Sequence, residues 1–255
     1  MGKISYRTVI EAATLLAVAA SGALCFASVT YNPPIDLGSF GLGEDQAWAS
    51  SINSEGEVIG QAYGPDGQLP FIWTGEGGMH SFGALTWPCG AEAINDRGQI
   101  VGWDSQGAFL YDHGEIYRLG NVRRYEECAL DINNLGQVVG GARLGGPQTR
   151  PALFEVGAVQ EIEGLQGAYG AATAINDEGD IVGRYQISTG SSRPFLCRDS
   201  VVTDLGVFGR AWDINNSGQI VGQADHGFLW NNGVLQDLGG LAASAINEAG
   251  FIGGY

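Results

Sequence analysis

Residues 172–183 read Ala-Thr-Ala-Ile-Asn-Asp-Glu-Gly-Asp-Ile-Val-Gly, and this stretch decides the fold because the chain repeats its pattern. The shared pattern is Ile-Asn-x-x-Gly-x, two aliphatic residues and a final Gly, with an Ala three residues before the Ile. Its six copies begin at Ile52, Ile94, Ile132, Ile175, Ile214 and Ile246, and the last has Gly in the second aliphatic slot. Successive copies are 42, 38, 43, 39 and 32 residues apart. Such a period, with several short apolar runs per unit, indicates a β-propeller or a β-solenoid.

The local chemistry predicts four strands in each unit. The Asn side chain can close a turn over the backbone, and the Gly accepts the left-handed conformation that completes this turn. The residues on its two sides, Ala-x-x-Ile-Asn and Ile-Val-Gly, therefore form a hairpin of strands A and B. A short apolar run such as residues 194–197 (Pro-Phe-Leu-Cys) predicts strand C, and residues 204–206 (Asp-Leu-Gly) are typical of the end of strand D.

We expect an all-β fold, a six-bladed β-propeller of four-stranded antiparallel blades, with strand A innermost because Ala leaves room where the blades converge. The sixth unit contains only strands A and B, at residues 243–247 and 251–254. Residues 28–31 and 35–38 fit strands C and D. The sequence therefore predicts a sixth blade closed by strands from both termini, which removes exposed sheet edges. A β-solenoid is the alternative, although its coils are normally shorter.

The repeats resemble the HAF family of extracellular repeat proteins, which is named for a His-Ala-Phe run in strand C. The resemblance covers residues 28–255 and rests on the six Ile-Asn-x-x-Gly copies together with the Phe-Leu-Trp and Asp-Leu-Gly runs. The naming tripeptide is poorly kept, since residues 226–228 (His-Gly-Phe) are its nearest copy. The resemblance implies an exported protein with a repeated β fold, and it implies no established reaction and no catalytic residues.

Composition narrows the possible partners. The chain has 42 Gly among 255 residues, which argues against long helices because an interior Gly costs about 1 kcal/mol relative to Ala. Acidic residues outnumber basic ones 28 to 12, and the formal net charge is −16. Since nucleic-acid binding depends on clustered Lys and Arg, we expect no nucleic-acid partner.

The first 27 residues predict a secretory signal peptide. Lys3 and Arg7 precede an apolar segment at residues 12–24, and residues 25–27 (Cys-Phe-Ala) provide small residues for cleavage after Ala27. An uncleaved membrane anchor at residues 8–27 is the alternative, since this stretch is just long enough to cross a bilayer. We expect a single β-propeller domain at residues 28–255 that is secreted, periplasmic or on the cell surface, with no stable membrane insertion after cleavage.

Three cysteines follow the predicted signal peptide. Cys89 and Cys128 lie five and four residues before their motif Ile in neighbouring units. A disulfide between them is therefore a prediction for an oxidising compartment. Cys197 replaces the aromatic residue of strand C and is expected to be a buried small hydrophobe.

The predicted ring has two faces that differ in their loops. The A–B turns all have the same length, whereas the B–C and D–A loops of the other face vary, and variable loops on a uniform scaffold commonly bind ligands. Arginines and aromatic residues concentrate in these loops. The candidate ligand face comprises Arg123, Arg124, Arg143, Arg150, Arg184, Arg193, Arg210, Tyr125, Tyr185 and Trp87.

The residue types that commonly bind metals or catalyse reactions form no such pattern in this sequence, so we predict no cofactor, metal site or catalytic group. His80, His113 and His226 fall in different units and at different repeat positions, so nothing gathers them around a metal or a nucleophile. A weak calcium site at residues 177–180 (Asp-Glu-Gly-Asp) is an alternative to a plain turn. The favoured function is a non-enzymatic binding or scaffold module for a surface glycan or protein partner. The alternative is an extracellular hydrolase or lyase acting on acidic polysaccharide, in which Arg and Tyr would neutralise a uronate and abstract a proton.

Overall fold

The computed structural model describes residues 35–38, 40, 47–64, 67–82, 85–120, 127–186, 190–240 and 242–255. Every regular element in this part of the chain is a β-strand, which confirms the all-β prediction. No helix in the described ranges is long and apolar enough to cross a membrane. The predicted signal peptide at residues 1–27 and the predicted strand at residues 28–31 lie outside the described residues.

The strands form consecutive antiparallel sheets in chain order. The first contains β1 (Ala47–Ile52), β2 (Val58–Gly64), β3 (Gly67–Thr74) and β4 (Gly78–Ser81). The second contains β5 (Gly90–Ile94), β6 (Ile100–Asp104), β7 (Gly107–Asp112) and β8 (Glu115–Arg118). The third contains β9 (Glu127–Ile132), β10 (Val138–Ala142), β11 (Arg150–Glu155) and β12 (Ala158–Glu161).

The remaining sheets continue the same order. The fourth contains β13 (Tyr169–Ile175), β14 (Ile181–Gln186), β15 (Arg193–Arg198) and β16 (Val201–Asp204). The fifth contains β17 (Arg210–Ile214), β18 (Ile220–Gln223), β19 (Gly227–Asn231) and β20 (Val234–Gly239). The sixth has two strands, β21 (Ala243–Ile246) and β22 (Ile252–Gly254).

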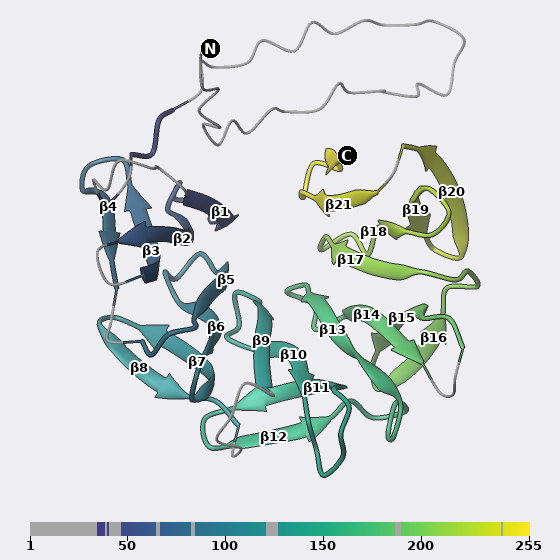
Figure 1. Cartoon of the computed structure of the whole chain (residues 1–255). Coiled ribbons are helices and arrows are strands. Elements are labelled where there is room, and N and C mark those ends of the chain that lie inside the picture. Colours follow the sequence, from purple (N-terminus) through teal and green to yellow (C-terminus); the bar gives the residue numbers. More distant parts are fainter. Residues whose placement is uncertain are drawn as a thin grey trace, which may run out of the picture.

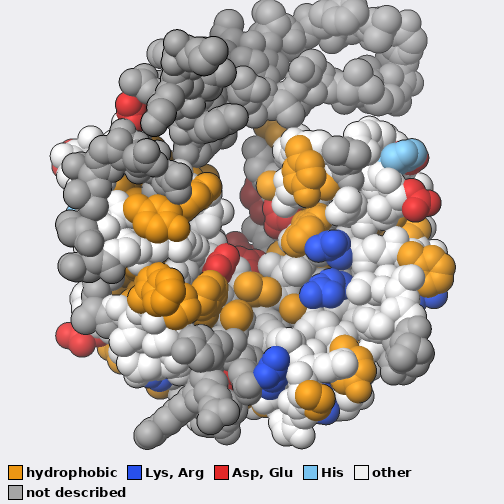
Figure 2. Space-filling model, in the orientation of Figure 1, with side chains coloured by type: hydrophobic (Ala, Val, Ile, Leu, Met, Phe, Trp, Pro, Cys, Tyr) orange, Lys and Arg blue, Asp and Glu red, His pale blue; other side chains and the backbone are white. Residues whose placement is uncertain are grey.

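The sheets resemble blades arranged around a common centre, with the first strand of each sheet innermost (Figure 1). Figure 2 shows that the molecule is hollowed at this centre and that acidic side chains lie in the hollow. The described residues do not close the ring. Residues 35–38 form no strand, contrary to the sequence prediction, and no described strand pairs with the outer edge of β22. In this segment the Asp36 side chain accepts a hydrogen bond from the Gly38 amide at 3.0 Å, which produces a turn.

A β-bulge recurs in the innermost strand of every sheet and explains the last glycine of the motif. Each motif Ala pairs with the glycine that ends Ile-Val-Gly, for example Ala129 with Gly140, and the register shifts directly after it. A Cβ on Gly140 would lie 2.0 Å from the Cys128 carbonyl oxygen. Because that approach is too close for any side chain, the bulge requires glycine there.

The turn between the first two strands of each sheet has the predicted conformation. The Asn133 side-chain oxygen accepts hydrogen bonds from the amides of Leu135 and Gln137, at 3.1 and 2.9 Å. The turn glycine is left-handed, with φ of 83° at Gly136. All six turn glycines have positive φ, which confirms the prediction: Gly56, Gly98, Gly136, Gly179, Gly218 and Gly250.

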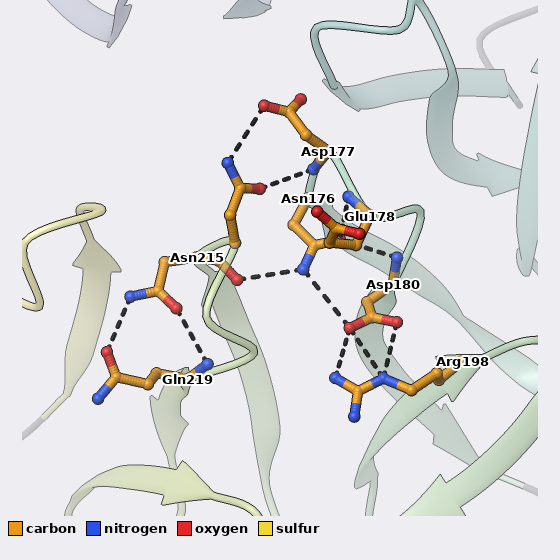
Figure 3. A network of polar contacts seen from close by, with 8 residues as sticks. Asn176, Asp177, Glu178, Asp180, Arg198, Asn215 and Gln219 are labelled. Atoms are coloured by element: carbon orange, nitrogen blue, oxygen red, sulfur yellow. Dashed lines mark hydrogen bonds and ion pairs between the residues drawn. The ribbon is translucent and has the colours of Figure 1, made fainter.

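The same asparagines connect neighbouring sheets, which the sequence did not predict. The side-chain nitrogen of Asn176 donates to the Asn215 carbonyl oxygen at 3.1 Å, while its side-chain oxygen accepts the Asp180 backbone amide and closes its own turn (Figure 3). The residue after the motif Asn makes a second contact with the next sheet. There the Asp177 amide donates to the Asn216 side chain at 2.8 Å. The hydrogen bond from the motif Asn side chain to the next motif Asn is present at each of the five described sheet junctions, and its donors are Asn53, Asn95, Asn133, Asn176 and Asn215.

The hydrophobic core is divided into layers between adjacent sheets. Val101 of β6 and Ala129 of β9 belong to one cluster, and Val182 of β14 and Ala211 of β17 to another. These four side chains are almost completely buried. Each sheet is therefore stabilised mainly by the faces of its two neighbours, as in other repeat architectures.

Candidate ligand-binding face

The structure brings the described candidate residues to one end of the sheets. Arg150, Arg193 and Arg210 are the first residues of β11, β15 and β17. Arg184 pairs with Pro194, and Tyr185 with Arg193, where β14 approaches its end. This end, opposite the Asn-x-x-Gly turns, is called the loop face below. The predicted candidates Arg123, Arg124 and Tyr125 lie outside the described residues.

Two of these arginines form ion pairs with carboxylates of their own sheets. Arg193 forms an ion pair with Asp204 at 2.5 Å, and the Tyr185 hydroxyl donates to the same carboxylate at 2.9 Å. Partial burial opposes ionisation of Asp204, but the hydrogen bonds from the Gly206 amide, Arg193 and Tyr185 lower its pKa overall. Burial and the adjacent carboxylate raise the pKa of Tyr185. Arg150 likewise forms an ion pair with Glu161. These arginines are less available to a ligand than the sequence alone suggested.

Arg184 and Arg210 are exposed and have no carboxylate partner among the described residues. The Arg210 guanidinium lies over the Trp212 ring, 4.7 Å from its centroid, which positions the cation without neutralising it. Arg184 lines a pocket of about 300 Å³ between the third and fourth sheets, which is also lined by Tyr169, Gln148 and Gln186. Figure 2 shows basic side chains on the side of the loop face formed by β13–β18.

The other two described candidates differ in exposure. Arg143 is half-buried in the connection between β10 and β11. Trp87 precedes β5 and is 67% exposed. Trp is enriched at binding interfaces, because its ring combines a large apolar area with one polar N–H group.

The inner strands bring further aromatic and acidic residues to the same face, which the sequence did not single out. Trp48 and Trp212 lie in β1 and β17, and Glu92 lies in β5. Trp48 is 49% exposed. The feature of the sequence that could have identified them is their position, directly before or after the motif Ala.

The acidic turn at residues 177–180 has structural partners. Asp180 forms an ion pair with Arg198 at 2.5 Å (Figure 3). Asp177 accepts a hydrogen bond from the Asn134 backbone amide at 2.7 Å. Within the described ranges, no three His, Cys, Asp or Glu side chains gather as metal ligands would. These contacts favour the plain turn over the calcium alternative.

Two further carboxylates lie on inner strands and join adjacent sheets. Asp131 of β9 accepts the Ile175 amide at 2.7 Å, and Asp213 of β17 accepts the Ile246 amide at 2.8 Å. Burial raises the pKa of Asp131 to about 7 and that of Asp213 to about 6, against the effect of these hydrogen bonds. Each also lies near other acids, which favours the protonated form.

The histidines do not join these carboxylates. His80 is in β4, an outermost strand, and His113 contacts Asp112 in the turn between β7 and β8. His226 contacts Asp237 of β20 at 3.1 Å. In the described part of the chain, no histidine lies with a tyrosine and an arginine at the centre of the ring.

The predicted disulfide is not formed in the structure, where Cys89, Cys128 and Cys197 are free thiols. Cys89 lies two residues before its motif Ala and Cys128 only one. The Cys89 thiol lies 3.8 Å from the Gln68 carbonyl oxygen of the first sheet, whereas Cys128 belongs to β9 of the third sheet. Cys197 is buried, as predicted.

Comparison with known proteins adds no family to these observations. No family model matches the chain, and no curated protein matches it. The resemblance to HAF repeats therefore stays a prediction that rests on the repeated motif itself.

Proposed function

We propose that this chain is an exported, non-enzymatic binding module, a six-bladed β-propeller whose loop face binds an anionic surface glycan. The observation that carries the proposal is the pair Arg184 and Arg210. Both are exposed cations on the loop face, and neither has a carboxylate partner in the part of the chain that the structure describes, although the net charge of the chain is −16. Arginine presents a planar fork suited to carboxylate or sulfate groups.

Local geometry at the N-terminal end supports closure of the ring. The Asp36–Gly38 turn repeats the contacts of Asp204 with Gly206 and of Asp237 with Gly239, which end the outermost strands β16 and β20. Leu37 packs against the first sheet, just as Leu205 packs against the fifth. These contacts of residues 36–38 support the proposal that residues 28–38 supply the two outer strands of the sixth blade.

The binding proposal is tested with a soluble uronate polymer as probe. The double variant Arg184→Ser/Arg210→Ser should bind the polymer at least tenfold more weakly than the parent protein at low salt, and added salt should weaken binding by the parent. Arg97→Ser is the matched control, because Arg97 is exposed at the opposite end of the sheets and donates to the Asn134 carbonyl oxygen.

The same experiment separates the alternatives. Equal retention of the double variant and the parent would contradict the proposal. Binding of an acidic peptide, with no binding of the polymer, would replace the glycan by a protein partner. New reducing ends in the polymer would favour the hydrolase or lyase, which the scattered positions of His80, His113 and His226 do not support.

A further inference from the structure

Aromatic side chains also gather on the loop face, on the other side of the ring from Arg184 and Arg210. Trp48, Tyr63 and Trp87 are 49%, 44% and 67% exposed. Figure 2 shows large hydrophobic side chains over the first two sheets on this side of the central hollow. We call Trp48, Tyr63 and Trp87 the aromatic patch.

Two of the three rings belong to the first sheet, and the third comes from the connection between the first and second sheets. The Trp48 and Tyr63 rings meet edge to face, with centroids 5.8 Å apart. Trp87 comes from the connection that leads into β5 and lies against Gly67, where an added Cβ would be 3.8 Å from Trp87 Cδ1. Gly67 pairs with Gly64 in the hairpin beside Tyr63. The patch is therefore formed by the first sheet and the connection that leads from it to the second.

Hydrogen-bonding groups adjoin the patch. Trp103 Nε1 donates to Glu92 Oε1 at 2.8 Å, which fixes the carboxylate, and Gln68 donates to Gln61. The second carboxylate oxygen of Glu92 has no hydrogen-bond partner within the described ranges. Gln61 therefore adds a further amide next to this fixed carboxylate.

A glycine allows this polar cluster to form. A Cβ on Gly90 would lie 2.8 Å from Gln61 Nε2 and 3.1 Å from both Glu92 Oε1 and Trp103 Nε1. Any larger residue would push these three side chains apart. The corresponding position holds a side chain in each of the other five sheets: Trp48, Cys128, Ala171, Arg210 and Ala242.

Aromatic faces beside a fixed carboxylate and an amide complement a pyranose ring, whose C–H face is apolar and whose rim carries hydroxyl groups. The carboxylate disfavours an anionic ligand at this place. A quaternary ammonium ion would also suit aromatic rings and a carboxylate, but it cannot form hydrogen bonds with the Gln61 side chain. The chemistry at this junction favours a neutral, hydroxylated ring.

We propose that the aromatic patch, together with Gln61 and Glu92, binds a neutral sugar residue. This inference rests on the proposed function only in taking the loop face as the ligand face. It adds a sugar-stacking subsite that is separate from the arginines. A glycan with both neutral and acidic residues would use the two sides of the face together.

The test measures binding of neutral gluco-, manno- and galacto-oligosaccharides by titration calorimetry. Trp48→Ala and Trp87→Ala should each weaken binding of the preferred oligosaccharide at least tenfold, and Glu92→Gln should weaken it less. Tyr117→Ala is the matched control, because Tyr117 is 43% exposed on the outermost strand β8. Circular dichroism verifies that each variant is folded, as expected for substitutions of exposed rings.

The outcomes distinguish this inference from the proposed function. The variant Arg184→Ser/Arg210→Ser should keep its affinity for the neutral sugar while losing the uronate polymer. Binding of the polymer without any binding of neutral oligosaccharides would overturn the sugar subsite and leave the proposed function intact. Equal affinities for Trp48→Ala, Trp87→Ala and Tyr117→Ala would also overturn it, as would choline binding that depends on Trp48 and exceeds every sugar.

Discussion

Glycine has two separate roles within one repeat, and each role can be removed by a single substitution. Gly136 has φ of 83°, a conformation that strains any residue with a Cβ, most of all a β-branched one. Gly140 is needed for space, since its Cβ would collide with the Cys128 carbonyl oxygen. The sequence predicted the first role from the turn chemistry. It did not predict the second, because the bulge depends on how two strands meet.

We therefore expect Gly136→Val to lower the free energy of unfolding by more than about 1 kcal/mol. Gly75→Val is the control, because Gly75 lies outside the left-handed region and has nothing within 4 Å of its Cβ position. Chemical denaturation of both variants gives the comparison. Equal stability of the two would show that the turn conformation does not select glycine.

The asparagines of the turns should contribute more than the glycines. Asn133 is 4% exposed, accepts two amides of its own turn and donates to the Asn176 carbonyl oxygen at 2.9 Å. We expect Asn133→Ala to cost about 2 kcal/mol or more, since it leaves buried polar groups unpaired. Asn133→Asp keeps the acceptor and removes the donor. If it were as stable as the parent in denaturation experiments, the bond between sheets would contribute nothing.

At the scale of single strands, the sequence predicted the order of elements well. The four strands of each of the first five units form as expected, because turn chemistry and alternating apolar residues both specify them. The availability of the loop-face arginines could not be predicted. Arg150 and Arg193 pair with Glu161 and Asp204 on neighbouring strands, whereas Arg184 has no such partner within the described ranges. Cross-strand pairing depends on the register, which a spacing pattern does not reveal.

Two carboxyl groups on the inner strands should make the free energy of unfolding depend on pH. The pKa of Asp131 is raised to about 7, mainly by burial, so the folded state holds this proton between about pH 4 and 7, where the unfolded chain has lost it. The contribution of Asp131 to stability therefore falls as the pH rises through this window. Asp213, with a pKa of about 6, acts in the same direction.

We expect Asp131→Asn to flatten this dependence, because Asn keeps an oxygen for the Ile175 amide and cannot ionise. Thermal unfolding of the parent and the variant at several pH values between 4 and 8 provides the measurement. The parent should lose more stability over this range than the variant. An identical slope for both would contradict the role assigned to Asp131.

At the scale of the whole molecule, the two ends of the described array expose apolar residues that the repeat buries elsewhere. Ile52 is 59% exposed, whereas its counterparts Ile94 and Ile214 are each 6% exposed. Leu238 is 37% exposed, against 4% for Leu119 and 6% for Leu205. These residues lie where a complete sixth blade would cover them. The repeat predicted six units, but it could not specify how weakly patterned terminal residues pair.

Deletion of residues 28–38 tests the proposal that this segment completes the sixth blade. Two proteins, one beginning at residue 28 and the other at residue 39, are compared by amide hydrogen exchange and thermal unfolding. We predict that the longer protein protects the amides of β22 and melts in one transition, while the shorter one loses this protection and melts at a clearly lower temperature. Equal protection of β22 and equal melting temperatures would contradict closure by this segment.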